Sequence, residues 1–208
     1  MAVFTIINKD RRGRDALYTT GTDLYKLISY VCEKSCSVGG QGIYLIGRQG
    51  ITNQFLYSQK CSGKKLIRRA RHYVLSFDTS GWEWQITAED IERIMPSICA
   101  FVFRNHQCLW GVHNKYNNRH VHIIVNPVSI VDQKVLHWSI TDFNNAMHEI
   151  AIILYNSLGV ALQSVSYIKE DGTLRIDPND QYHFLYENRR SSSIPLKNKV
   201  NGKVTAFS

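Results

Sequence analysis

The spacing of apolar and polar residues predicts a first helix over residues 23–34. Its apolar positions recur at intervals of three and four, at Leu24, Leu27, Ile28 and Val31. Thr22 stands where a side chain can cap the first turn. Residues 47–71 are polar, contain glycine and become increasingly basic, so we interpret them as a loop.

Two further helices are predicted from their start signals. Residues 87–90 (TAED) form a capping box, and apolar residues follow at helical spacing until Pro96, which should kink or end the helix. Residues 139–142 (SITD) begin a third helix, and Gly159 stands where a left-handed residue would end it.

Short runs of alternating or β-branched residues predict strands between these helices. The predicted strands cover residues 3–7, 72–78, 108–113, 120–126, 160–167 and 181–186. Helices and strands do not alternate regularly, so we expect an α+β fold with a central, mainly antiparallel sheet and helices mainly on one face. Residues 1–186 should form one domain, and residues 187–208 a basic, polar tail that is loose or marks a truncation point.

The charge of the chain points to a polyanionic partner. Lys and Arg number 25 against 17 Asp and Glu, which gives a net charge of +8. Nucleic acid is the first expectation and a membrane surface the second. The apolar runs are too short to insert in a membrane and the N-terminus does not resemble a signal peptide, so we expect a cytoplasmic protein. The odd number of cysteines, five, argues against a disulfide framework.

Basic residues are densest between residues 60 and 71, where they could follow a DNA backbone. A solvated loop of no such function would look the same. The candidates for DNA contact are Lys64, Lys65, Arg68, Arg69 and Arg71.

Three histidines form the sharpest chemical feature. His120 and His122 are two residues apart in a predicted strand, so their side chains leave the same face. If the polar residues 114–119 close a hairpin, His113 lies opposite His120, with Cβ atoms about 4.5–5.5 Å apart. Three converging imidazoles suit one divalent metal, for which Mn, Zn, Ni and Co are favoured by the ligand type. The alternative is a polar, solvated face of the sheet.

Other polar residues should line the same site. His72, Ser76 and Asp78 share one face of a predicted strand, where Ser76 or Asp78 could orient a metal-bound imidazole. Asn126, on the histidine face, could bind phosphate or one of the ligand histidines. The alternative for His72, Ser76 and Asp78 is a solvated strand face with no such role.

The segment HNKYNNRHVHIIVN, residues 113–126, resembles the third motif of the conjugative relaxases of the His-hydrophobe-His endonuclease superfamily, in their P-type mobilisation class. Residues 71–77 (RHYVLSF), with the helix start that follows, are similar to the second motif. The helix segment 24–31 resembles the first motif, which places the nucleophile at Tyr30. Lys115 stands where the family has an aspartate that helps to orient or charge-balance the site. That role is either absent here or supplied by another residue.

The resemblance implies a five-stranded sheet and a metal-dependent, site-specific single-stranded DNA endonuclease and transesterase. Such an enzyme nicks a transfer origin through a 5′-phosphotyrosine during conjugative mobilisation, with Mn or Mg as the expected metal and relaxosome proteins as possible accessories.

Two rival functions stay open. One is a rolling-circle replication initiator, for which Tyr155 on the last helix is the candidate tyrosine. The other is a non-catalytic DNA-binding module with a structural metal. Tyr25 and Tyr18 remain alternative nucleophiles within the relaxase interpretation.

Overall fold

The computed structural model describes residues 1–7, 18–78, 86–115, 118–163, 166–168 and 174–176. Within these residues the chain forms an antiparallel five-stranded sheet in the order β1-β3-β5-β4-β2, with four helices, as predicted for an α+β fold. The elements are β1 (Ala2–Ile6), α1 (Gly21–Lys34), β2 (Ser37–Gln41), α2 (Arg48–Cys61), β3 (Arg71–Asp78), α3 (Ala88–Val102), β4 (His106–Lys115), β5 (Asn118–Ser129) and α4 (Ile140–Leu158), with a separate two-stranded sheet of β6 (Ser166–Ile168) and β7 (Leu174–Ile176).

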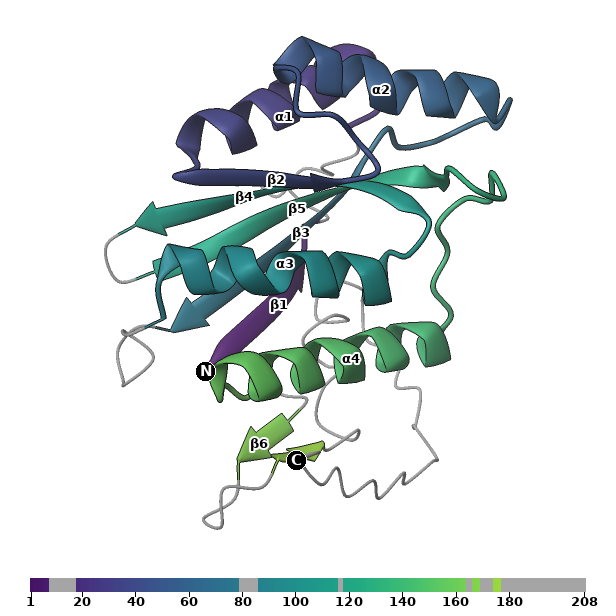
Figure 1. Ribbon diagram of the computed structural model, residues 1–208. Coiled ribbons are helices and arrows are strands. Elements are labelled where there is room, and N and C mark those ends of the chain that lie inside the picture. The colour runs from purple at the N-terminus through teal and green to yellow at the C-terminus, as the bar shows by residue number, and fades with distance from the viewer. Residues whose placement is uncertain (8–17, 79–85, 116–117, 164–165, 169–173, 177–208) are drawn as a thin grey trace.

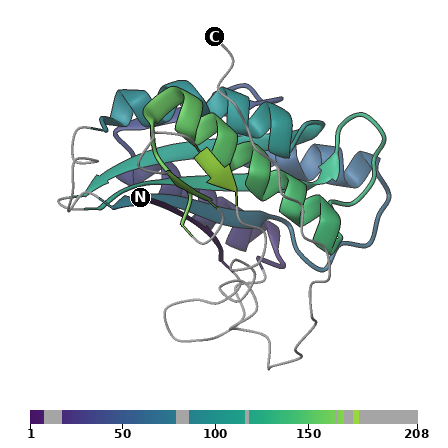
Figure 2. The ribbon, with the colours of Figure 1, turned by 90° about the horizontal axis from the view of Figure 1, so that it is seen from below.

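Helices cover both faces of the five-stranded sheet, so the expectation of helices mainly on one face is wrong (Figure 1). Helices α3 and α4 lie side by side on one face (Figure 2), above a core that includes Val121, Ile123 and Val125 of β5. Helices α1 and α2 pack on the opposite face, above Leu109 and Ile124. Successive residues of a strand point to opposite faces, so one strand supplies both cores. The face of the histidines is therefore partly covered by α1 and α2.

The helices predicted from apolar spacing are present, with corrections at their ends. Thr20, not Thr22, caps α1, because its hydroxyl is the one that reaches the backbone N–H of Asp23 while the Asp23 carboxylate reaches back. The predicted capping boxes of α3 and α4 are confirmed, and Gly159 ends α4 in the left-handed conformation. Helix α3 does not end at Pro96 but continues to Val102. Pro96 lies on the exposed side, and residues on both sides of it are buried against the sheet.

Helix α2 and strand β2 were not predicted, for reasons visible in their sequences. Helix α2 buries Ile51, Thr52, Phe55 and Gln59, so half of its buried positions are polar and the apolar stripe is hidden. Strand β2 has the sequence SVGGQ, whose glycines weaken any strand signal. Of the predicted later strands, part of 160–167 forms β6, whereas residues 181–186 and the tail 187–208 lie outside the described residues.

A glycine in β4 sets how closely α1 approaches the sheet. A Cβ atom at Gly111 would lie 2.6 Å from Cγ1 of Val31 and would also collide with the Ser35 hydroxyl. Both of those residues lie at the C-terminal end of α1, and Gly111 is paired with His122 across the hairpin. The missing side chain therefore lets α1 rest directly beside the histidines.

We expect Gly111→Ala to lower the free energy of unfolding by about 1–3 kcal/mol, because the added methyl overpacks the contact with α1. Urea unfolding followed by circular dichroism measures the change. Gly21→Ala is the matched control, since its Cβ would meet only the flexible end of Leu56, at 3.3 Å. Equal stability of the Gly111→Ala variant and the wild type would contradict this account of the helix–sheet contact.

Candidate active site

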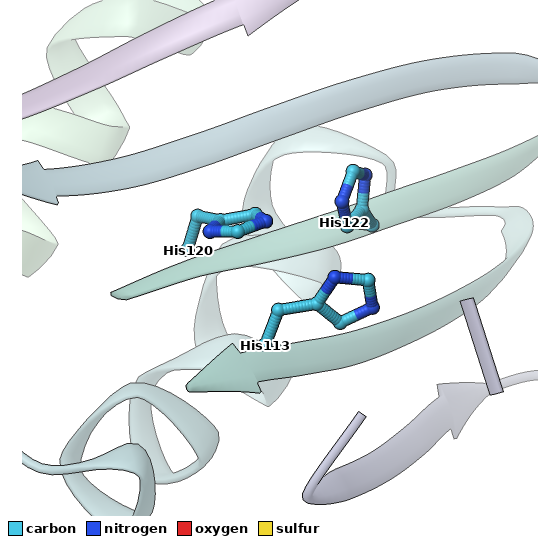
Figure 3. A group of neighbouring side chains, drawn as sticks. All are labelled: His113, His120 and His122. Atoms are coloured by element: carbon cyan, nitrogen blue, oxygen red, sulfur yellow. The ribbon is translucent and has the colours of Figure 1, made fainter. Parts of the chain in front are cut away.

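The β4–β5 hairpin brings three histidines together on one face of the sheet (Figure 3). His113 is paired directly with His120, as the sequence predicted, and His122 is paired with Gly111. The centroid of the His113 ring lies 5.1 Å from that of the His120 ring and 4.4 Å from that of the His122 ring. One ring nitrogen from each histidine can be chosen so that all three lie within 4.8 Å of one another.

The donor set of this cluster fits a divalent metal ion. His113 and His122 are 2% and 7% exposed, whereas His120 is half-buried and lies nearest to solvent. Imidazoles packed this closely disfavour one another's charged form, and the neutral form is the one that binds a metal. Three nitrogen ligands leave coordination positions for water or substrate oxygens. These residues could therefore hold one ion that still meets a ligand from solution.

Two of the histidines have partners on the ring nitrogen that would face away from such an ion. Nε2 of His113 lies 3.4 Å from the backbone carbonyl of Val31, to which it can donate. Nδ1 of His122 lies 2.8 Å from Nε2 of His72. Metal-binding histidines commonly use their second nitrogen in this way, which fixes the ring. The arrangement leaves Nδ1 of His113 and Nε2 of His122 as the nitrogens for an ion.

Tyr30 projects from α1 onto the histidine cluster. Its ring meets His113 and His122 edge to face, with centroid separations of 5.5 and 5.4 Å. The side chain is 38% exposed, so one side of it faces solvent. The next residue, Val31, supplies the carbonyl for His113. The same turn of α1 thus positions both the tyrosine and one of the histidines.

The polar face of strand β3 lies beside the histidine hairpin. Ser76 is paired with His120, and Asp78 is paired with Asn118, although the side chain of Asp78 lies outside the described part of the structure. His72 is buried, and its contact with His122 is the one that the sequence did not reveal. Burial, helped by nearby His113, lowers the pKa of His72 to about 4, so this imidazole is neutral at pH 7.

Tyr18 completes a chain of contacts behind the cluster. Its hydroxyl lies 3.0 Å from Nδ1 of His72, whose other nitrogen contacts His122. The sequence places Tyr18 in a polar loop, where nothing marks it as a partner of a histidine 54 residues away. Such a contact depends on how the loop returns to the sheet, which residue spacing does not encode.

Asn126 lies in a buried network rather than in the lining of the site. Its side-chain oxygen accepts from Gln59 at 3.1 Å, and its amide nitrogen donates to Gln107 at 2.8 Å and to the carbonyl of Phe55 at 3.2 Å. The side chain is fully buried. These bonds join α2 to β4 and β5, so the structure gives Asn126 a role in holding α2 on the sheet.

The basic residues predicted to contact DNA do not form one surface. Lys64 and Lys65 are exposed after α2, and Arg68 is half-buried. Arg69 lies 3.3 Å from the side-chain oxygen of Gln59, to which it donates. Arg71 is paired with Val125, so strand alternation places it on the α3–α4 face, opposite to the histidines. Lys64, Lys65 and Arg68 remain candidates for contact with DNA, and Lys64 and Lys65 are the most exposed of the five.

Comparison with known families identifies the chain. Residues 30–160 match the family model described as "Relaxase: MobA/VirD2-like, nuclease domain". The chain belongs to this relaxase family. The match begins at Tyr30 and includes the histidine hairpin, and it confirms the resemblance seen in the sequence motifs. No curated protein and no solved structure matches the chain. A search of the described residues found no helix with the length and apolar character needed to cross a membrane.

Asn126→Ala should lower the free energy of unfolding by about 1–3 kcal/mol, because Gln59 and Gln107 would lose a buried hydrogen-bond partner. Thermal or urea unfolding measures the loss, and Asn53→Ala on the exposed side of α2 serves as the control. Metal affinity of the folded variant should stay at the wild-type value. A stable variant with impaired metal binding would instead place Asn126 in the site.

Proposed function

We propose that this relaxase domain nicks single-stranded DNA at a transfer origin, with Tyr30 as the nucleophile and His113, His120 and His122 as ligands of one divalent metal ion. The observation that carries the proposal is the edge-to-face contact of the Tyr30 ring with two of the three clustered histidines. Family membership supports a nuclease acting in DNA mobilisation.

The chemistry follows from the types of residue at the site. His113, His120 and His122 would hold a divalent ion, which when bound would supply positive charge to the oxygens of the scissile phosphate. The Tyr30 oxygen forms a bond to phosphorus, the bond from phosphorus to the 3′ oxygen breaks, and the phenolic proton is lost to base while the 3′ oxygen takes up a proton. The product is a 5′-phosphotyrosine and a free 3′-hydroxyl. The phosphoester bond is exchanged rather than hydrolysed, so the strand can be rejoined without ATP.

Mn²⁺ or Mg²⁺ is the proposed physiological ion because phosphate oxygens would complete its coordination shell. The three imidazoles by themselves favour Mn²⁺, Zn²⁺, Ni²⁺ or Co²⁺ over Mg²⁺, which prefers oxygen ligands. The half-buried position of His120 supports substrate access from its side of the cluster.

The proposed substrate is single-stranded DNA held mainly through its phosphates. The net charge of +8 and the exposed Lys64 and Lys65 support this mode of binding. Accessory relaxosome proteins, and a cytoplasmic setting on a conjugative or mobilisable element, are proposed from the family alone.

The replication-initiator alternative is less well supported by the geometry. Its candidate tyrosine, Tyr155, lies on α4, which packs on the face of the sheet opposite to the histidines. A tyrosine there would have to act across the sheet. A non-catalytic DNA-binding module would account for the histidines and the charge but not for the position of Tyr30.

We expect the double variant His120→Ala and His122→Ala to lose binding of Mn²⁺ and Zn²⁺ in isothermal titration calorimetry, because two of the three nitrogen donors are gone. Exposed His137→Ala is the control and should bind as the wild type does. Wild-type affinity should fall as the pH is lowered, because protons compete with the metal for the lone pairs of the imidazole nitrogens. Unchanged metal affinity in the double variant would refute this site.

Tyr30→Phe should abolish the covalent adduct with an origin-strand oligonucleotide in the presence of Mn²⁺, because only the nucleophilic oxygen is removed. Gel shift under denaturing conditions and mass spectrometry of the linked peptide measure the adduct. Metal binding should persist. Tyr25→Phe, on the same helix, is the matched control and should retain the adduct. An adduct mapped to Tyr155 would favour the replication initiator instead.

A further inference from the structure

His72 lies directly behind one of the clustered histidines. Strand β3 pairs with β5, and His72 stands opposite Ile124, two residues along β5 from His122 on the same face of the sheet. Its Nε2 lies 2.8 Å from Nδ1 of His122, and its Nδ1 lies 3.0 Å from the hydroxyl of Tyr18. The His72 side chain is 6% exposed, so protein atoms rather than water surround these contacts.

The direction of these hydrogen bonds is determined once His122 binds a metal. Nδ1 of His122 is occupied by His72, so Nε2 is the nitrogen that can present its lone pair to an ion. A neutral imidazole that uses Nε2 as ligand carries its proton on Nδ1. That proton is then donated to Nε2 of His72, which in turn must carry its own proton on Nδ1 and donate to the Tyr18 oxygen.

We propose that His72 and Tyr18 are positioning residues that hold His122 in its metal-binding tautomer and orientation, a role that rests on the metal site of the proposed function. A free histidine side chain favours the opposite tautomer, with the proton on Nε2, in which the nitrogen facing the cluster could not bind an ion. The acceptor on His72 stabilises the binding-competent form before the metal arrives. Tyr18 in turn stabilises the form of His72 that offers this acceptor.

The backbone around Tyr18 supports this assignment. Tyr18 has a φ of 45°, in the left-handed region that a bulky aromatic residue rarely adopts. Its carbonyl accepts from the backbone N–H of Arg69 at 2.8 Å. The segment before α1 is therefore tied to the segment before β3, and the unusual conformation directs the phenol onto His72.

Metal affinity of His72 variants tests the proposal. His72→Leu fills a similar volume but has no acceptor, and we expect its dissociation constant for Co²⁺ to rise by about 10- to 100-fold in calorimetry. His72→Gln can place a carbonyl oxygen near the position of Nε2, and we expect it to recover most of the affinity. Tyr18→Phe keeps the ring and should show a smaller loss than His72→Leu. The visible absorption of bound Co²⁺ should change in His72→Leu and return towards the wild-type spectrum in His72→Gln.

His106→Leu is the matched control, because it removes a part-buried histidine that contacts a backbone carbonyl at the other end of β4. It should bind Co²⁺ as the wild type does. If His72→Leu also binds Co²⁺ with wild-type affinity and spectrum, His72 does not position the ligand and the proposal is wrong. Wild-type affinity in Tyr18→Phe would remove Tyr18 from the role. If the wild type binds no metal at all, the metal site of the proposed function is wrong. That result differs from wild-type metal binding in His72→Leu, which would overturn only the positioning role.

A measurement on the wild-type protein avoids any dependence on variants that fold poorly. Nitrogen-15 NMR of the zinc-loaded protein reports the tautomer of each histidine ring. We expect the proton on Nδ1 in both His122 and His72. A proton on Nε2 of His72 would overturn the proposal, because that nitrogen could then not accept from His122.

Discussion

The register of the β4–β5 hairpin is the constraint on which the site depends. Side chains alternate between the two faces, so a shift of one residue between the strands would send His113 and His120 to opposite sides. The register is held from both sides of the sheet. Val121, Ile123 and Val125 are buried beneath α3 and α4, while Ile124 is buried beneath α1 and α2. The apolar residues beside the histidines in β5 thus fix the positions of the histidines themselves.

Helix α1 converts this set of histidines into an asymmetric site. It rests beside Gly111 and places Tyr30 against His113 and His122, while the carbonyl of Val31 meets the outer nitrogen of His113. His113 and His122 are buried on the covered side of the cluster, and His120 is half-buried on the side nearer to solvent. On the proposed function, a substrate phosphate would therefore approach from the side of His120.

Local sequence signals predicted the parts of this site that lie close together in the chain. The histidine pattern needed only a hairpin and the two-residue period of a strand, and both are present. The polar face of β3 and the capped starts of α3 and α4 were predicted on similar grounds. Asn126 shows where this reasoning ends. It stands on the histidine face, but its side chain bonds to α2, and that helix was not predicted because half of its buried residues are polar.

Contacts between distant segments also determine whether the partners of the metal-binding histidines are charged or neutral. Lys115 occupies the position at which the relaxase pattern has an aspartate, and its side chain lies outside the described part of the structure. The two outer partners that the structure gives to His113 and His122 are a backbone carbonyl and another imidazole, both uncharged. Neutral partners orient the ligands without neutralising an ion that they hold. A divalent ion there would keep more of its positive charge for the phosphate than it would beside a carboxylate, because Coulomb attraction in a buried site is weakly screened. On the proposed function, this charge would favour binding of the phosphodiester and so bring phosphorus within reach of the tyrosine oxygen.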